Sequence, residues 1–191
     1  MRSFLAIDIP KEVKNDLFGF SKRLKSILPN SASWVKGDNF HITLCFLGEV
    51  EENFLSRIKE PLELSLKHIR PFLVSLGQFS FMPLKKPRIL YVDMLKGSLE
   101  LKRVYERIRE SIGVYVSDDV FLKGFLPHVT IARMKRYTYE IGQLLEKTKE
   151  ATVSLKTFEV KSVGVFESVL KKEGAKYNII QHVTFGESCL T

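Results

Sequence analysis

The sequence predicts an α+β fold made by a pseudo-two-fold duplication of a β-α-β-α-β unit, with two lobes whose antiparallel sheets line a central cleft. The first observation behind this prediction is a repeated phrase. His41-Ile42-Thr43-Leu44 and His128-Val129-Thr130-Ile131 both read His, β-branched apolar residue, Thr, aliphatic residue, and they lie 87 positions apart. The second observation is that strand-like alternation and helix-like periodicity follow one another in the same order in both halves of the chain.

The first half starts with an alternating segment and continues with apolar residues at helical spacing, and Pro71 ends its second helix. These patterns predict strands over 3–9, 40–47 and 72–82, helices over 11–28 and 51–69, and a turn over 30–33.

The second half runs through the same order. It predicts a strand over 88–94, helices over 98–112 and 138–149, a strand over 127–133, and a hairpin of 152–168 with 176–185 that turns at 171–175. The register also holds outside the repeated phrase, since Tyr91 aligns with Tyr177 at an offset of 86. We therefore expect one domain over 1–191 made of two repeat halves, about 1–87 and 88–191.

The repeated phrase places one histidine and one hydroxyl on the same face of each strand, because residues two apart share a face. Strict alternation also puts Cys45 on the face of Thr43, although a small packing residue is the favoured interpretation. A lone histidine in an apolar strand is more often structural than catalytic. Two copies at matching repeat positions instead favour an acid/base pair that works near neutral pH.

Metal binding is the main alternative for two histidines. Zinc needs three or four ligands with recognisable spacing, and no acidic residue lies within four positions of His128. We expect neither a metal nor a cofactor. His182-Val183-Thr184-Phe185 has the letters of the repeated phrase, but His182 aligns with Lys96 in the repeat and is expected to be a strand-end residue without a catalytic role.

The net charge of +8 and the isoelectric point of about 9.4 favour a polyanionic partner such as RNA. The longest uncharged run, 72–84, is 13 residues long, shorter than the roughly 20 that span a bilayer. No signal-peptide core precedes the first acidic residue, Asp8. The sequence therefore predicts a soluble, cytoplasmic protein without a membrane segment.

Two pairs of one histidine and one threonine, converging from opposite sides, could hold a phosphodiester. Threonine hydroxyls and imidazolium groups donate to phosphate oxygens, while one neutral imidazole takes a proton from water and the other gives one to the leaving oxygen. A strained five-membered cyclic phosphate is a natural target for this arrangement.

These residues resemble the two-histidine (2H) phosphoesterases, and within them the LigT-like RNA 2′,3′-cyclic phosphodiesterases, also called 2′–5′ RNA ligases. The likeness is carried by the segments 2–10, 34–35, 39–48, 87–91 and 127–133. The resemblance implies a bilobal α+β fold and metal-independent opening of RNA 2′,3′-cyclic phosphate to a 2′-phosphate. It also implies reversible 2′–5′ ligation of the kind seen with tRNA halves.

The resemblance assigns roles to six residues. They are His41 and His128 as the acid/base pair, Thr43 and Thr130 as phosphate anchors, Arg133 as a further substrate contact, and Phe46 as a base-stacking surface. By analogy His41 is the acid on the 3′ oxygen and His128 the base on water.

Two other functions stay open at this point. One keeps the chemistry but acts on small cyclic nucleotides, and the other is a non-catalytic module that binds RNA ends. The duplication already supplies a two-fold axis, so a monomer is expected.

Overall fold

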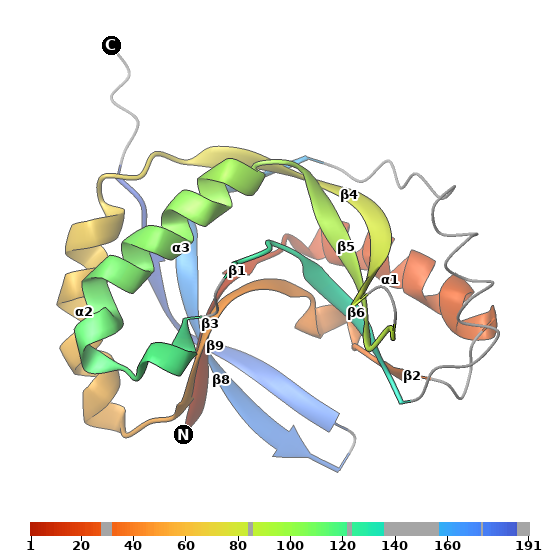
Figure 1. Ribbon diagram of the computed structural model, residues 1–191, viewed down its shortest axis with the longest axis horizontal. Helices are drawn as coiled ribbons and strands as arrows, with labels where there is room; N and C mark the ends of the chain where they lie inside the picture. Colours follow the sequence, from red (N-terminus) through yellow and green to blue (C-terminus); the bar gives the residue numbers. More distant parts are fainter. Residues whose placement is uncertain (28–31, 84–85, 122–123, 136–156, 173, 187–191) are drawn as a thin grey trace.

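The computed structural model describes residues 1–27, 32–83, 86–121, 124–135, 157–172 and 174–186. Within these ranges it is an α+β fold in which nine strands form one curled antiparallel sheet with helices packed on its outside (Figure 1). None of the described helices combines the length and the apolar character needed to cross a bilayer.

The elements follow the predicted order. They are β1 (Arg2–Asp8), α1 (Lys11–Ile27), β2 (Ala32–Trp34), β3 (His41–Glu49), α2 (Glu52–Leu66), β4 (Phe72–Met82), β5 (Ile89–Lys96), α3 (Ser98–Ile112), β6 (Val129–Met134), β7 (Phe158–Val160), β8 (Ser162–Lys171) and β9 (Gly174–Thr184).

Three details differ from the sequence prediction. β2 is a short strand where part of a turn was expected, and the strand expected over 152–168 is divided into β7 and β8. The hairpin strands also continue further toward the turn than expected, to Lys171 and from Gly174. The helix predicted over 138–149 lies outside the described residues.

Helix α3 illustrates why the helices form where the periodicity predicts them. Leu101, Val104, Ile108 and Ile112 recur at three- and four-residue spacing and are all fully buried. Together with α2 this helix covers the face of the sheet that carries Ile42. The opposite face of the sheet is thereby left for polar and aromatic side chains.

The strands are ordered β7-β4-β5-β6-β3-β1-β8-β9, and β2 pairs with β6 beside this path. Six of these strands form a symmetric series, β4-β5-β6-β3-β1-β8. Counted outward from its centre, β6, β5 and β4 on one side correspond to β3, β1 and β8 on the other. Such an order places a pseudo-two-fold axis between β3 and β6. It is consistent with repeat halves that divide near residue 87, a division that stays a prediction.

Strands β3 and β6 meet at one register position, where Ile42 lies opposite Val129. Both side chains are fully buried. Further along β6, the same edge pairs with β2 instead of β3, with Trp34 opposite Ala132. The two central strands therefore diverge directly after they have brought the two repeated phrases together.

Each of these strands contains a β-bulge at the same repeat position. In β3 the extra residue is Leu44, which falls between the pairs Leu5–Cys45 and Ala6–Thr43. A bulge shifts the alternation of side chains by one residue. Cys45 is consequently buried in the main core, so the expectation that it shares the face of Thr43 was wrong.

In β6 the extra residue is Ile131, which falls between the pairs Leu90–Ala132 and Tyr91–Thr130. Leu44 and Ile131 are 87 positions apart, the same offset as the two histidines. Each bulge places the residue two positions after the extra one on the face of the histidines. These residues are Phe46 in β3 and Arg133 in β6, and both are exposed.

We expect Ile42→Ala to lower the free energy of unfolding by about 2–5 kcal/mol, because the change leaves a cavity where the two halves of the sheet join. Urea denaturation followed by circular dichroism measures this loss. Glu49→Ala, at the exposed end of the same strand, is the control and should change stability by less than about 0.5 kcal/mol. Equal effects of the two substitutions would contradict the structural role of the Ile42–Val129 pair.

Candidate active site

The two repeated phrases place their polar residues on one face of the sheet. In the antiparallel register set by Ile42 and Val129, the position opposite His41 is that of Thr130, and the position opposite Thr43 is that of His128. The four predicted residues thus form a square of two imidazoles and two hydroxyls, and all four are half-buried.

His41 is held at both ring nitrogens. Its Nδ1 lies 2.7 Å from the carbonyl oxygen of Asn39, and its Nε2 lies 2.8 Å from Thr43 Oγ1. A carbonyl can only accept, so Nδ1 carries a proton. In the neutral ring Nε2 is then the acceptor, and the Thr43 hydroxyl donates to it.

His128 is held in the same way at Nδ1, which lies 2.8 Å from the carbonyl oxygen of Leu126. Leu126 and Asn39 both stand two residues before their histidine, so the repeat preserves this backbone contact. His128 Nε2 has no protein partner in the part of the chain that the structure describes. Its lone pair is therefore available to water or to a ligand.

The pKa of both histidines is lowered. For His41 the fall is from 6.5 to about 4, chiefly because burial disfavours the charged ring, with smaller contributions from Lys14 and His128. For His128 burial is again the main cause and Arg133 adds to it. In the free protein both imidazoles are thus neutral at pH 7.

Three aromatic rings enclose the His41 side of the site. The centroid of the His41 ring lies 4.9 Å from that of Phe4, 5.3 Å from that of Tyr177 and 6.0 Å from that of Phe166. Gly164 makes room for this cluster, since a Cβ there would come within 2.6 Å of the Phe166 ring. These rings supply the burial that lowers the pKa of His41.

A tyrosine edge contacts each motif histidine. Tyr91 packs against His128 with ring centroids 5.4 Å apart, as Tyr177 packs against His41. These are the two tyrosines that the repeat aligns. The sequence analysis used them for the register and missed their place in the site, although their alignment was the signal that could have found them.

A side-chain hydrogen bond ties the β8–β9 hairpin to the His41 phrase. Asn39 Nδ2 donates to the carbonyl oxygen of Ala175 at 2.7 Å, while the Asn39 carbonyl accepts from His41. The hairpin thereby keeps Tyr177 against the His41 ring. Asn39 is a second residue of the site that sequence reasoning missed, because its partner is 136 positions away.

A half-buried ion pair lies behind His41. Lys14 Nζ is 2.8 Å from Asp8 Oδ1 and donates to the Asp38 carbonyl at 3.1 Å. A cavity of about 70 Å³ separates this pair from the rings of Phe166 and Tyr177. Such a volume has room for about two water molecules beside His41.

The other expected site residues are also located. Phe46 is 51% exposed, and its ring centroid lies 5.9 Å from that of Phe4. Arg133 stands on the exposed face of β6, opposite Ile89. His182 is exposed on β9 with its Nδ1 3.4 Å from Ser162 Oγ, and its ring packs against neither motif histidine. Among the described residues, no cluster of three or more His, Cys, Asp or Glu could hold a metal ion.

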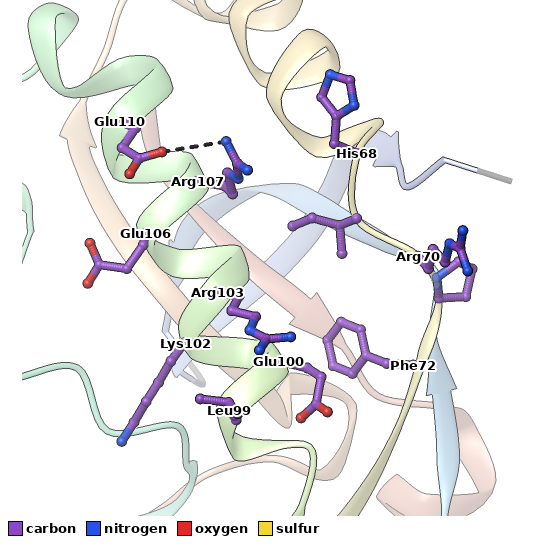
Figure 2. A pocket seen from close by; sticks show the side chains of 12 residues that line it. His68, Arg70, Phe72, Leu99, Glu100, Lys102, Arg103, Glu106, Arg107 and Glu110 are labelled. Carbon is purple, nitrogen blue, oxygen red and sulfur yellow. Dashed lines mark ion pairs between the residues drawn. The ribbon is translucent and has the colours of Figure 1, made fainter. Parts of the chain in front are cut away.

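A larger cavity, of about 840 Å³, lies away from these residues. It is bounded by α3 and by the segment that leads from α2 into β4, where Arg70, Phe72, Leu99 and Arg103 line it (Figure 2). Neither motif histidine lines it. This cavity and the two motif histidines therefore lie in different parts of the molecule.

The chain matches known proteins along most of its length. A protein of Methanocaldococcus jannaschii named RNA 2′,3′-cyclic phosphodiesterase is 31% identical over 95% of this chain and 99% of its own. A protein of the same name from Thermotoga maritima is 28% identical over 97% and 96%. Residues 7–91 match the model of the LigT-like phosphoesterase family.

The chain belongs to the LigT-like phosphoesterase family. The fold of this LigT-like phosphoesterase agrees with that of Escherichia coli LigT in its apo form, with a TM-score of 0.73, 21% identity and 97% of both chains covered. A second structure of that protein, complexed with 3′-AMP, has the same TM-score at 19% identity, with 97% of this chain and 98% of that one covered. The family resemblance and the fold class expected from the sequence are confirmed.

We expect Asn39→Ala in this LigT-like phosphoesterase to raise the pKa of His41 toward its usual value, because the hairpin that shields the ring loses its anchor. The pKa of His128 should not change. NMR titration of the labelled imidazoles measures both values. Asn178→Ala, which removes a side chain on the same hairpin that donates to Glu167, is the control. An unchanged pKa of His41 in Asn39→Ala would contradict the anchoring role.

Proposed function

We propose that the chain hydrolyses RNA ends that carry a 2′,3′-cyclic phosphate to 2′-phosphate ends, with His41 and His128 as the acid/base pair. The observation that carries this proposal is the square of two imidazoles and two hydroxyls, in which both rings have a fixed Nδ1 proton. The names of the Thermotoga and Methanocaldococcus relatives support the substrate.

In the proposed reaction the phosphate binds at the centre of the square. His128 Nε2 takes a proton from a water molecule, which attacks phosphorus from the side opposite the 3′ oxygen. The bond from phosphorus to O3′ breaks, and His41 gives that oxygen a proton. The product carries a 2′-phosphate and a free 3′ hydroxyl.

The different hydrogen bonding of the two rings supports this division of roles. His128 has an Nε2 lone pair that no described residue occupies, as a general base requires. His41 must be protonated to act as the acid, although its pKa is about 4 in the free protein. The negative charge of the bound phosphate raises the pKa of a nearby imidazole, so we infer that His41 takes up its proton as the substrate binds.

Thr43 and Thr130 complete the phosphate site in this proposal. Their hydroxyls donate to the non-bridging oxygens, and the imidazolium adds a charged donor. Donors already in place where negative charge develops stabilise a transition state without reorganisation. We therefore propose that no metal ion is needed.

Phe46 and Arg133 occupy equivalent positions of the repeat but have different chemistry. We propose that Phe46 stacks the terminal base on the His41 side, where the aromatic rings gather. Arg133 would contact a phosphate of the RNA on the His128 side. The substrate would then bind in one direction across a nearly symmetric square.

Other parts of the proposal rest on the family. They are a reversible 2′–5′ ligation of RNA ends, with tRNA halves among the substrates, and a cytoplasmic monomer. The complex of Escherichia coli LigT with 3′-AMP supports a nucleotide ligand.

We expect His41→Ala and His128→Ala each to lower kcat by at least about 10²–10⁴-fold, because each removes a proton-transfer group. The assay uses an RNA oligonucleotide that ends in a 2′,3′-cyclic phosphate, incubated with EDTA, and separates 2′- from 3′-phosphate products. His182→Ala is the matched control, since it removes the histidine of the third His-x-Thr sequence and should keep full activity. Retained RNA binding without any product from the wild type would favour the non-catalytic module.

The pH dependence should differ between kcat/KM and kcat. For kcat/KM, which reports the free protein, the profile should be bell-shaped and bounded by the lowered pKa values of the two histidines, that of His41 being about 4. For kcat, which reports the complex, the bound phosphate raises the pKa of both histidines and so moves the profile to higher pH. Steady-state rates between pH 3.5 and 9 measure both profiles, at roughly half-unit steps. Coincident profiles would contradict the proposed proton uptake.

A further inference from the structure

The β8–β9 hairpin extends past the rest of the sheet (Figure 1). The residue pairs near its tip give it two chemically different faces. Directly paired residues of antiparallel strands share a face. Phe166 pairs with Ile179, and Ser168 pairs with Tyr177. Since the rings of Phe166 and Tyr177 both contact His41, this face looks toward the candidate active site.

Beyond Ser168, the site-facing side is apolar as far as the turn. Leu170, which pairs with Ala175, is 74% exposed, and Ile179 is 39% exposed. The opposite side carries the pairs Val169–Lys176 and Lys171–Gly174, so it is mixed and basic. Large apolar side chains are thus exposed on the face that leads to the histidines.

This apolar face is continuous with the aromatic cluster around His41. Phe4 stacks on Phe166 with centroids 5.0 Å apart and also contacts Tyr177 and Phe46. Phe4, Ala6 and Phe166 form a hydrophobic cluster of their own, separate from the main core. We call the whole surface the aromatic shelf, and define it as Phe46, Phe4, Phe166, Tyr177, Ile179 and Leu170.

We propose that the aromatic shelf binds the unpaired bases that precede the cyclic phosphate of an RNA substrate. This inference rests on the proposed function and adds to it a requirement for a single-stranded 3′ end of at least two nucleotides. The shelf begins at the phosphate site and runs outward along the hairpin. A nucleobase offers an apolar π face to such a surface while its phosphates stay in solvent.

Charge favours RNA as the occupant. The chain carries a net charge of +8, and no described residue forms an ion pair with Lys171, Lys172 or Lys176 near the turn. Lys171 and Lys176 lie on the side of the hairpin opposite the shelf, and Lys172 lies at the turn. Their long side chains border the hairpin, where they would attract the phosphates of an RNA strand whose bases contact the apolar side. A base-paired end would keep its bases stacked on one another and could not use the shelf.

The test compares two adjacent residues on opposite faces of β8. Leu170→Glu puts a negative charge on the aromatic shelf, and Val169→Glu puts the same charge on the other face. The substrates are a nucleoside 2′,3′-cyclic monophosphate and a single-stranded tetranucleotide with the same end. Leu170→Glu should raise KM for the tetranucleotide about tenfold, a loss of about 1.4 kcal/mol, because the carboxylate replaces an apolar contact and repels the RNA phosphates. It should leave KM for the mononucleotide unchanged.

Val169→Glu should change neither KM by more than about twofold, because its side chain lies off the shelf. Leu170→Trp should lower KM for the tetranucleotide, because it enlarges the contact surface. A misfolded variant would not bind more tightly, so this result separates loss of contact from misfolding. Thermal unfolding checks that all variants fold. Equal effects of the two Glu variants, or equal use of a blunt duplex and a single-stranded end, would overturn the inference.

A failure of the proposed function would appear differently. The wild type would then turn over neither substrate, and binding of a fluorescent tetranucleotide would replace KM in the same comparison. Unchanged RNA binding in Leu170→Glu would overturn the shelf and leave this face to a protein partner.

Discussion

One pairing, between Ile42 and Val129, joins the two sides of the sheet and determines the geometry of the candidate site. Because both residues are the middle member of a His-x-Thr phrase, burying them turns two histidines and two threonines onto the opposite face. The antiparallel direction then sets each histidine against the threonine of the other phrase. A parallel meeting of the same strands would have set histidine beside histidine, with no hydroxyl opposite either.

The paired bulges place two further residues on the face of the histidines. Leu44 and Ile131 let each strand present the residue five positions after its histidine on the same face as the histidine. A nearly symmetric scaffold thereby offers two equivalent positions, and the chain fills one with an aromatic ring and the other with a guanidinium. The proposed binding of the substrate in one direction depends on this difference, since the square itself is nearly symmetric.

The sequence predicted what depends on local periodicity and missed what depends on distant contacts. The strands, the helices α1 to α3 and the repeated phrases follow from alternation and spacing within a few residues. The bulges do not, because strict alternation puts Cys45 on the face of Thr43 and Phe46 on the other. Phe46 and Arg133 came from the family resemblance, and the bulges explain how they can serve there. The bond from Asn39 to Ala175 could not be foreseen, because it depends on how far the sheet curls.

The curl also explains why the two histidines differ. Tyr91 reaches His128 from β5, the strand next to β6, whereas Tyr177 reaches His41 from β9, three places along the sheet from β3. The two tyrosines that the repeat aligns thus make similar ring contacts from strands at different places in the sheet. His41 lies against three rings and near the half-buried Lys14, so its charge is set by packing, and its pKa falls to about 4. The hydrogen bond to the Asn39 carbonyl and the charge of Asp8 raise this pKa but do not offset the burial. An anion beside the ring would raise it further, and the centre of the square is where the proposal places the phosphate. In the proposed reaction, the packing that keeps His41 neutral in the free protein thus makes its protonation depend on the bound substrate.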